Sequence, residues 1–401
     1  MGRGPHLRLR PRPSHRGRRG PERPHHHREG PPVGSALTHD DDAMTLGIIG
    51  VGKISEQYFA AFESLPGVRL VAVADLDLDR ARTVAEAQGV DALSVDDLIA
   101  DPRIQAVLNL TIPAAHAEVD LRVLEAGKHV YGEKPLALSP AEAEPILRLA
   151  EERGLRVGSA PDTVLGTGIQ TARQVLDAGT IGKPVAANAF WGAPGHELWH
   201  PAPSFYYQPG AGPLFDMGPY YLTALVTLLG PITRVQGASL RSDRVRSAAS
   251  DPEAREIPVT VDTHVSAVLT HESGAVSTVT MSFDIWATRI PNIEVYGTAG
   301  TLSVPDPNHF SGQVQVATSE EREWKDVEPS AGFVDAGRGC GLAEMADAIR
   351  RGVPHRASGE LAFHVLEVMD AILDPAATGE IRSTVGRPEA VPLGQPGRSE
   401  R

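Results

Sequence analysis

One stretch of this chain decides its fold: Leu46-Gly47-Ile48-Ile49-Gly50-Val51-Gly52-Lys53-Ile54-Ser55. Its apolar first part predicts a buried strand, and Gly50 permits the tight turn that follows. Gly52 lets a ligand approach the backbone, and the next helix would direct its free N–H groups toward a pyrophosphate. Ser55 stands where such loops often carry a third glycine, and it is small enough for close helix–strand packing. The stretch therefore predicts a dinucleotide-binding loop.

A second apolar run, from Val68 to Ala74, ends at Asp75. An acidic residue about 20–25 positions after the first glycine can accept hydrogen bonds from the adenosine ribose hydroxyls. A carboxylate here repels a 2′-phosphate, and Leu76 and Asp77 supply no arginine to hold one. We therefore expect NAD in preference to NADP. The simpler alternative is a generic βαβ unit with an aspartate that caps a helix.

Apolar strands and amphipathic helices alternate as far as about residue 164, which predicts a doubly wound parallel sheet of the Rossmann type. Beyond that point the strands alternate apolar and polar residues, which predicts an α+β domain with a large, mainly antiparallel open sheet. One face of this sheet should carry helices, and the other should pack against a second copy, giving a homodimer or homotetramer. The expected division is a basic tail at 1–43, a nucleotide-binding domain at 44–164, a substrate and oligomerisation domain at 165–385, and a polar tail at 386–401.

The composition narrows the class of protein. The formal net charge is −13 over 401 residues although the first 43 residues are rich in arginine, so the remainder is acidic and nucleic acid is an unsuitable partner. Met44 precedes the first strand directly, so the basic tail is either a real arm or an artefact of the assigned start. No apolar run is long enough to span a bilayer. Cys340 is the only cysteine and is expected to be structural, which fits a cytoplasmic protein.

Four segments then occur in a recognisable order: Gly47 to Gly52, Thr111 to His116, Ala126 to Pro135 and Gly210 to Tyr220. Together they resemble the glucose–fructose oxidoreductase, inositol dehydrogenase and rhizopine catabolism family, abbreviated Gfo/Idh/MocA. The third segment is the most specific of the four. The resemblance extends over about residues 45–382 and implies an NAD(P)-dependent dehydrogenase acting on a CH–OH group of a sugar, cyclitol or similar polyol.

The resemblance also implies roles for three residues. Lys134 is similar to the family's lysine that contacts both the substrate hydroxyl and the nicotinamide ribose, and the Lys134–Pro135 bond is expected to be cis. Asp216 matches the aspartate of the family's D-x-G-x-H pattern. Tyr220 stands where that pattern has histidine, as in members of the glucose–fructose oxidoreductase and dihydrodiol dehydrogenase types. This departure argues against inositol-type chemistry. Relatives of the glucose–fructose type hold NADP. Tyr220 therefore resembles a branch of the family that uses NADP, whereas Asp75 favours NAD.

Proton transfer at this site has two possible assignments. A phenol with an ordinary pKa of about 10 is a poor base at neutral pH, but a nearby ammonium lowers that pKa. Asp216 and Tyr220 are four residues apart and share one face of an expected helix over 214–229. Either Tyr220 is the proton donor and acceptor, activated by Lys134, or Lys134 is the acid/base and Tyr220 positions the substrate. A purely structural aromatic role for Tyr220 is a third possibility.

Contacts with the cofactor are expected from the glycine loop and from the ends of the following strands, at Gly50, Gly52, Lys53, Ile54, Asp75, Thr111, Pro113, His116, Glu133 and Lys134. His116 either contributes to the nicotinamide pocket or caps the next helix. Contacts with the substrate are expected from Lys134, Trp191, His200, Asp216 and Tyr220. His196 and His200 are four residues apart, but no carboxylate or cysteine completes a ligand set, so no metal is expected.

Two alternatives to a dehydrogenase remain open at this point. A glycosidase on the same scaffold would use bound NAD for a transient oxidation, and a sensor would keep the pocket without catalysing a reaction. The expected partner in each case is a small sugar or polyol, with neither nucleic acid nor a membrane.

Overall fold

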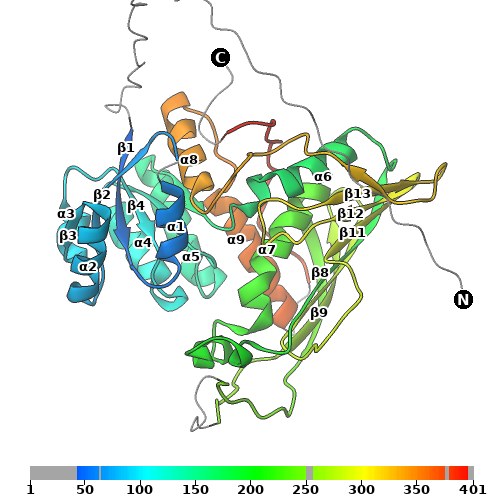
Figure 1. Ribbon diagram of the computed structural model, residues 1–401, viewed down its shortest axis with the longest axis horizontal. Coiled ribbons are helices and arrows are strands. Elements are labelled where there is room, and N and C mark those ends of the chain that lie inside the picture. The colour runs from blue at the N-terminus through cyan, green and yellow to red at the C-terminus, as the bar shows by residue number, and fades with distance from the viewer. Residues whose placement is uncertain (1–42, 63–64, 250–255, 375–378, 396–401) are drawn as a thin grey trace, which may run out of the picture. The chain divides into compact units, whose positions relative to one another are not determined.

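The computed structural model describes residues 43–62, 65–249, 256–374 and 379–395 (Figure 1). The predicted basic tail and the end of the predicted polar tail lie outside these ranges. Two sheets organise the described part of the chain, one of six strands and one of eight. Among the described residues, no helix has the length and apolar character needed to cross a membrane.

The six-stranded sheet is parallel throughout and has the order β3-β2-β1-β4-β5-β6. Its strands are β1 (Met44–Ile49), β2 (Val68–Ala74), β3 (Asp91–Leu93), β4 (Ala106–Asn109), β5 (His129–Gly132) and β6 (Val157–Ser159). Between them lie α1 (Ser55–Phe62), α2 (Leu78–Gln88), α3 (Val95–Ala100), α4 (His116–Glu125) and α5 (Pro140–Arg153). The predicted doubly wound parallel sheet is confirmed. Sequence reasoning missed β3, because it has only three residues and none of them is fully buried.

Local sequence explains where these helices begin and end. Asp77 precedes α2, and its carboxylate accepts a hydrogen bond from the Arg80 backbone N–H. That bond satisfies one of the free donors of the first turn. Gly89 ends α2 in the left-handed conformation, with φ of 68°, where a side chain would be unfavourable. Gly154 ends α5 in the same left-handed conformation.

The eight-stranded sheet has the order β14-β13-β12-β11-β7-β10-β9-β8. Only β7 and β10 pair in parallel; the other pairs are antiparallel. Its strands are β7 (Pro184–Gly192), β8 (Ile232–Leu240), β9 (His264–His271), β10 (Val276–Ser282), β11 (Ile293–Gly297), β12 (Gly300–Val304), β13 (Val314–Thr318) and β14 (Lys325–Val327). The prediction of a mainly antiparallel sheet is confirmed, although β13 and β14 were not foreseen.

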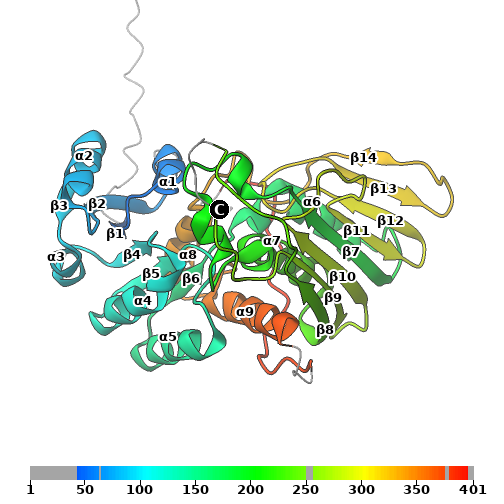
Figure 2. The same cartoon turned by 90° about the horizontal axis from the view of Figure 1, so that it is seen from below.

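Three helices cover one face of this sheet: α6 (Thr167–Asp177), α7 (Gly212–Leu229) and α9 (Gly359–Leu373) (Figures 1 and 2). In β9 the residues that face these helices are buried, among them Val265, Ala267 and Leu269. The remaining long helix, α8 (Cys340–Arg351), packs against β6 together with α9, and α9 also packs against α5. These contacts join the two sheets and bring the end of β5 close to α7. Cys340 is fully buried, as expected of a structural cysteine.

Candidate functional site

The glycine loop has the geometry that its sequence predicts. Gly50 has φ of +92°, and a Cβ placed there would lie 2.8 Å from the backbone of Leu110, so only glycine fits without strain. Around Gly52, by contrast, a Cβ would meet no described atom within 4 Å. Packing within the protein therefore does not require glycine at position 52. Open space in front of α1 is what a bound pyrophosphate needs, so these residues fit a dinucleotide.

Asp75 follows β2 directly and ties this strand to the glycine loop. Its Oδ2 accepts a hydrogen bond from the Val51 N–H at 2.9 Å, and its Oδ1 accepts one from the Asp77 N–H at 2.9 Å. These two bonds fix the carboxylate at the end of β2, beside the glycine loop. Sequence reasoning found no arginine nearby, but Arg80 of α2 brings a guanidinium nitrogen within 3.4 Å of Asp75. This half-exposed side chain lies one helical turn beyond the residues that were considered.

A cavity of about 560 Å³ opens beside the glycine loop, between α1 and α2. Its lining includes Gly52, Lys53, Glu56 and Arg80. Lys53 is mostly exposed and pairs with Glu56 at 2.5 Å, so its ammonium lies on the surface near the loop. Ile54 is half-buried against the core, and its carbonyl accepts a backbone bond from Gln57 at the start of α1.

The ring of His116 contacts the turn that follows β5 and holds it in place. The Lys134–Pro135 bond is cis, as predicted. The His116 ring places Nδ1 at 2.6 Å from the Pro135 carbonyl oxygen and Nε2 at 3.1 Å from the Thr111 carbonyl oxygen. Of the two roles left open for His116, the helix cap is not found, because His116 is the first residue of α4 and makes no capping bond. Its ring joins the Thr111 loop, which continues into a 3₁₀ turn at Pro113–Ala115, to the turn that carries Lys134.

Lys134 reaches α7 and forms a largely shielded ion pair there. Its Nζ donates to the main-chain oxygen of Asp216 at 2.7 Å and to Asp216 Oδ1 at 3.1 Å. The side chains of Lys134 and Asp216 are 17% and 15% exposed. Burial, the largest single effect, favours the neutral amine, but Asp216, Tyr220 and Glu133 together outweigh it and raise the pKa of Lys134. The lysine is thus an ammonium at neutral pH, with two of its three N–H bonds used within the protein.

His196 completes this group, although the expected substrate contacts included His200 of the same loop and not His196. Its Nε2 lies 2.6 Å from Asp216 Oδ2, and its Nδ1 lies 3.1 Å from the indole nitrogen of Trp199. Because an indole N–H can only donate, Nδ1 must accept, and the proton of the neutral ring is on Nε2. Burial opposes ionisation of Asp216, but Lys134 and the bond from His196 lower the pKa of its carboxyl group to about 2.

Tyr220 lies one helical turn after Asp216 and is 4% exposed. The Lys134 ammonium is 5.2 Å from the centre of its ring. Lys134 lowers the pKa of the phenol, as expected, but it does not bring that pKa into the neutral range. Burial raises the pKa of Tyr220, and the opposing effects of Lys134 and Arg338 do not overcome it. The phenol is therefore neutral at neutral pH and carries its proton.

Glu133 has several partners within the protein. One carboxylate oxygen accepts a hydrogen bond from the Tyr58 hydroxyl at 2.8 Å, and the other accepts one from the Lys134 N–H at 3.0 Å. A guanidinium nitrogen of Arg338 lies 3.9 Å from the first oxygen. Sequence reasoning did not consider Arg338, which also donates to the Tyr220 hydroxyl oxygen at 2.9 Å.

The loop that carries His196 is held by a buried network. Arg246 is fully buried in side chain and donates to Glu197, Asp284 and the hydroxyl of Tyr207. Tyr207 in turn donates to Glu197 and accepts from the His196 N–H at 3.2 Å. A buried guanidinium with such partners is costly to disturb, so it sets the position of the His196 backbone.

Two predicted substrate residues lie around this loop. The ring of Trp191 packs edge-on against His196, with centroids 6.0 Å apart. The ring of His200 packs against Trp199, Phe205 and Tyr206, and its Nδ1 accepts from the Ala202 N–H. The structure thus brings His196, and not His200, into contact with Asp216. The two histidines are four residues apart in one loop, and the sequence alone did not distinguish them.

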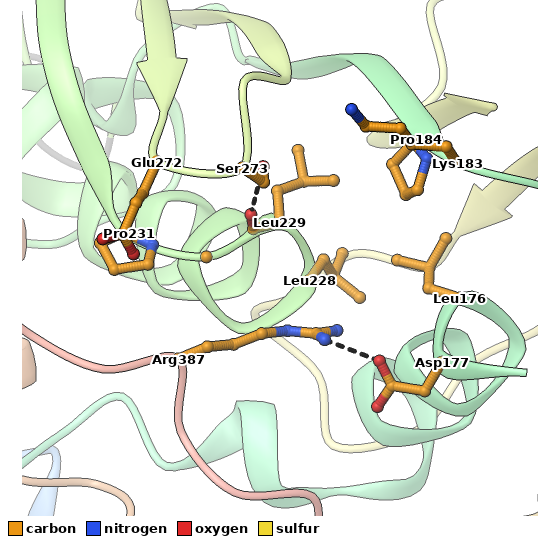
Figure 3. Close-up of a pocket in the computed structure, with 11 residues that line it drawn as sticks. Leu176, Asp177, Lys183, Pro184, Leu228, Leu229, Pro231, Glu272, Ser273 and Arg387 are labelled. Atoms are coloured by element: carbon orange, nitrogen blue, oxygen red, sulfur yellow. Dashed lines mark hydrogen bonds and ion pairs between the residues drawn. The ribbon is translucent and has the colours of Figure 1, made fainter. Parts of the chain in front are cut away.

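Two further features belong to other parts of the fold. Within the described ranges, no group of three or more His, Cys, Asp or Glu side chains is arranged to hold a metal ion. A pocket of about 380 Å³ lies where the ends of α6 and α7 meet the turn between β9 and β10 (Figure 3). Arg387 reaches across it to Asp177, at 2.6 Å. None of the predicted site residues lines this pocket.

Comparison with known proteins supplies the context for this geometry. Residues 44–160 match the model of an oxidoreductase family with an NAD-binding Rossmann fold, and residues 169–303 match the GFO/IDH/MocA C-terminal domain. The chain is 34% identical over 208 residues to dTDP-3,4-didehydro-2,6-dideoxy-alpha-D-glucose 3-reductase of Streptomyces violaceoruber, covering 51% of this chain and 60% of that protein. It is 36% identical over 153 residues to inositol 2-dehydrogenase of Gluconacetobacter diazotrophicus, covering 36% of this chain and 45% of that protein.

A solved structure resembles the whole fold. An NAD binding oxidoreductase from Klebsiella pneumoniae superposes with a TM-score of 0.70 at 25% identity, covering 82% of this chain and 96% of that chain. The two sequence matches above span less than two thirds of each relative.

Proposed function

Because the chain belongs to the Gfo/Idh/MocA family of NAD-binding oxidoreductases, we propose that it transfers a hydride between nicotinamide and a hydroxyl- or carbonyl-bearing carbon of a sugar, cyclitol or related polyol. The observation that carries this proposal is the contact between Lys134, after β5, and Asp216, on α7. It places an ammonium beside the carboxyl edge of the Rossmann sheet, where ligands of such sheets bind. The relatives named above are oxidoreductases and lend no support to the glycosidase or sensor alternatives.

The residues that would hold NAD are those of the glycine loop, with Asp75 at the adenosine ribose and Glu133 and Lys134 beside the nicotinamide ribose. A bound nicotinamide nucleotide supplies the hydride acceptor or donor. The rest of the reaction is binding and proton transfer, and these are tasks for the side chains of this chain.

Lys134 is proposed as the group that exchanges a proton with the reacting oxygen. Two of its N–H bonds go to Asp216, which leaves the third for substrate. When a carbonyl is reduced, the ammonium protonates the oxygen that develops negative charge. The reverse transfer, in oxidation, needs the neutral amine, which the raised pKa of Lys134 makes the minor form at neutral pH. Asp216 holds the lysine in place, and His196 fixes the far oxygen of that carboxylate.

Tyr220 is proposed as a hydrogen-bond donor to the same oxygen. Its phenol keeps its proton at neutral pH, so it stabilises negative charge on the substrate without taking a proton away. Of the two assignments left open by the sequence, we therefore propose Lys134 as the acid/base.

The aromatic side chains around His196 are proposed to form one wall of the sugar-binding site. Trp199 is 63% exposed and Phe205 is 52% exposed, and both belong to the loop that carries His196. An exposed aromatic ring offers an apolar surface to the C–H face of a sugar, while the Lys134 ammonium and the Asp216 carboxylate meet its hydroxyls. His200 would then support Trp199 and Phe205 from behind, in place of a direct contact with substrate.

The experiment that tests this function compares Lys134→Met with Tyr220→Phe under both NAD and NADP. We expect Lys134→Met to lose about 10²–10⁴-fold in kcat, as for loss of a general acid, while the glycine loop and Asp75 still bind the nucleotide. Tyr220→Phe should lower kcat less and keep the pH profile. Lys325→Met, at an exposed lysine of β14, serves as the matched control and should leave activity unchanged. Full activity of Lys134→Met would refute the assignment.

We also propose that the chain forms a homodimer or homotetramer through the eight-stranded sheet and acts in the cytoplasm. Val268 and Val276 point outward from the face opposite α6 and α7 and are 44% and 41% exposed. Apolar residues on an open sheet favour burial against another copy. The division at about residue 164 is likewise proposed, with the nucleotide domain before it and the substrate and oligomerisation domain after it.

A further inference from the structure

Arg338 lies in the segment that leads into α8 and meets three separate parts of the chain. Its Nη2 donates to the Tyr220 hydroxyl oxygen at 2.9 Å, and its Nε donates to Gln57 Oε1 of α1 at 3.3 Å. Its Nη1 lies 3.9 Å from Glu133. The side chain is only 11% exposed. Arg338 therefore connects the helix of the glycine loop and the Lys134 turn to α7.

The backbone on the C-terminal side of Arg338 is held rigidly. Asp162 is fully buried, and one of its carboxylate oxygens accepts from the Gly339 N–H at 2.8 Å and from the Gly341 N–H at 3.1 Å. Gly341 has no room for a side chain, because a Cβ would lie 2.3 Å from the Tyr131 hydroxyl. The main chain next to Arg338 is thus held in place, and the guanidinium is held by its own hydrogen bonds to Tyr220 and Gln57.

The direction of the Tyr220 proton follows from these contacts. A phenol oxygen can accept a hydrogen bond and has a single proton to donate. Arg338 occupies an acceptor position of Tyr220, and among the described residues Tyr220 donates to none. Arg338 Nη1 is also buried without an acceptor in the described part of the chain. Buried donors of this kind are normally completed by a ligand or a water molecule.

We propose that Arg338 is a positioning residue for the reaction, which holds the Tyr220 hydroxyl so that its proton is donated to the reacting oxygen of the substrate. This inference rests on the function proposed above. The charged and titratable groups that face the phenol are Lys134, Arg338 and Glu133, and the phenol of Tyr206 lies close enough to interact with it. Arg338 is the one among them that hydrogen-bonds to the phenol oxygen in the described structure.

The first test needs no substrate. The chain has seven tyrosines, and labelling each at Cζ with ¹³C gives NMR signals that report on the hydroxyl environment. The signal lost in Tyr220→Phe identifies Tyr220. We expect Arg338→Met to shift this signal more than those of the other tyrosines, and Arg338→Lys to shift it as well, because the ammonium lacks the planar fork of the guanidinium. Arg322→Met is the matched control, at an exposed arginine remote from α7 in sequence, and should leave the signal in place.

The second test uses kinetics with a substrate found in the screen described below. Loss of a hydrogen bond from a charged donor predicts a fall in kcat of about 10- to 100-fold for Arg338→Met, with KM little changed. In a Tyr220→Phe background the same substitution should have almost no further effect. If Arg338→Met does not fold, both the NMR test and the kinetic test are made with Arg338→Lys.

Two outcomes would overturn the proposal: a Tyr220 signal that does not respond to either substitution, or kinetic effects that simply add in the double variant. The NMR result stands whether or not the hydride-transfer function is right, so failure of one claim can be told from failure of the other.

Discussion

Replacing Asp216 by asparagine removes the charge that pairs with Lys134 while keeping the shape of the side chain. In the structure Asp216 accepts from Lys134 Nζ at 3.1 Å and from His196 Nε2 at 2.6 Å. Both members of the ion pair are less than one fifth exposed, so water screens their attraction only weakly. Stability should therefore fall when the carboxylate is lost.

The pKa of Asp216 gives the size of the effect. The folded protein lowers this pKa to about 2, from about 3.9 in an unfolded chain. A difference of about two pKa units corresponds to about 2.6 kcal/mol of unfolding free energy. Because the folded pKa is the lower one, this stabilisation is fully present above pH 5 and is lost as the pH falls toward 2. About half of it should remain near pH 3.

Urea unfolding of Asp216→Asn and of the unchanged protein, at pH 7 and at successively lower pH, measures this difference directly. The contributions of the other titrating groups to the unfolding free energy are the same in both proteins and cancel in the comparison. Asp79→Asn is the control, because Asp79 pairs with Arg82 at the surface and is 89% exposed in side chain, so its loss should change stability by less than about 0.5 kcal/mol. A deficit in Asp216→Asn that stays constant from pH 7 to pH 3 would refute the electrostatic reasoning.

Three further predictions concern other parts of the chain. Gly52→Ala should keep the melting temperature and weaken NAD binding, whereas Gly50→Ala should destabilise the fold by at least about 1 kcal/mol; calorimetry of both variants checks this, and equal destabilisation would contradict it. Asp75→Asn should lower the ratio of the Kd for NADP to the Kd for NAD at least about tenfold, because Arg80 is left free to meet a 2′-phosphate. An unchanged ratio in fluorescence titrations would argue against this role of Asp75. Burial lowers the pKa of His364 to about 4, so this residue should cost about 3 kcal/mol of stability as the pH falls from 7 to 4, and His364→Gln should flatten that dependence in urea unfolding.

The sequence predicts the fold well where local signals are strong. The glycine loop, the alternation of strands and helices up to β6, and the alternating pattern of β9 each identify their elements from nearby residues alone. Sequence reasoning missed β13 and β14 at one edge of the large sheet, where residues are mostly half-exposed or exposed and no clean alternation marks them. Edge strands are defined by their pairing partner more than by their own sequence.

The site shows the same division between local and distant signals. Lys134, Asp216 and Tyr220 lie in recognisable segments, and the structure brings them together. Arg338 was missed, and His200 was preferred to His196, because the roles of Arg338 and His196 depend on contacts across the fold: Arg338 is 118 residues away from Tyr220. For Arg80 a local signal did exist, since it lies in the first turn of the helix that follows Asp75. The pKa of Tyr220 was misjudged because burial cannot be read from neighbouring residues.

The measurement that tests the central claim most directly is a screen at 340 nm. The unchanged protein and Lys134→Met are each incubated with NAD or NADP and a panel of monosaccharides, cyclitols and sugar acids, after nucleotide binding by both proteins has been verified. Our account predicts that the unchanged protein produces NADH with one class of substrate, and that Lys134→Met produces it at least about 100-fold more slowly. Binding of NAD with no absorbance change for any substrate, in either direction, would contradict it.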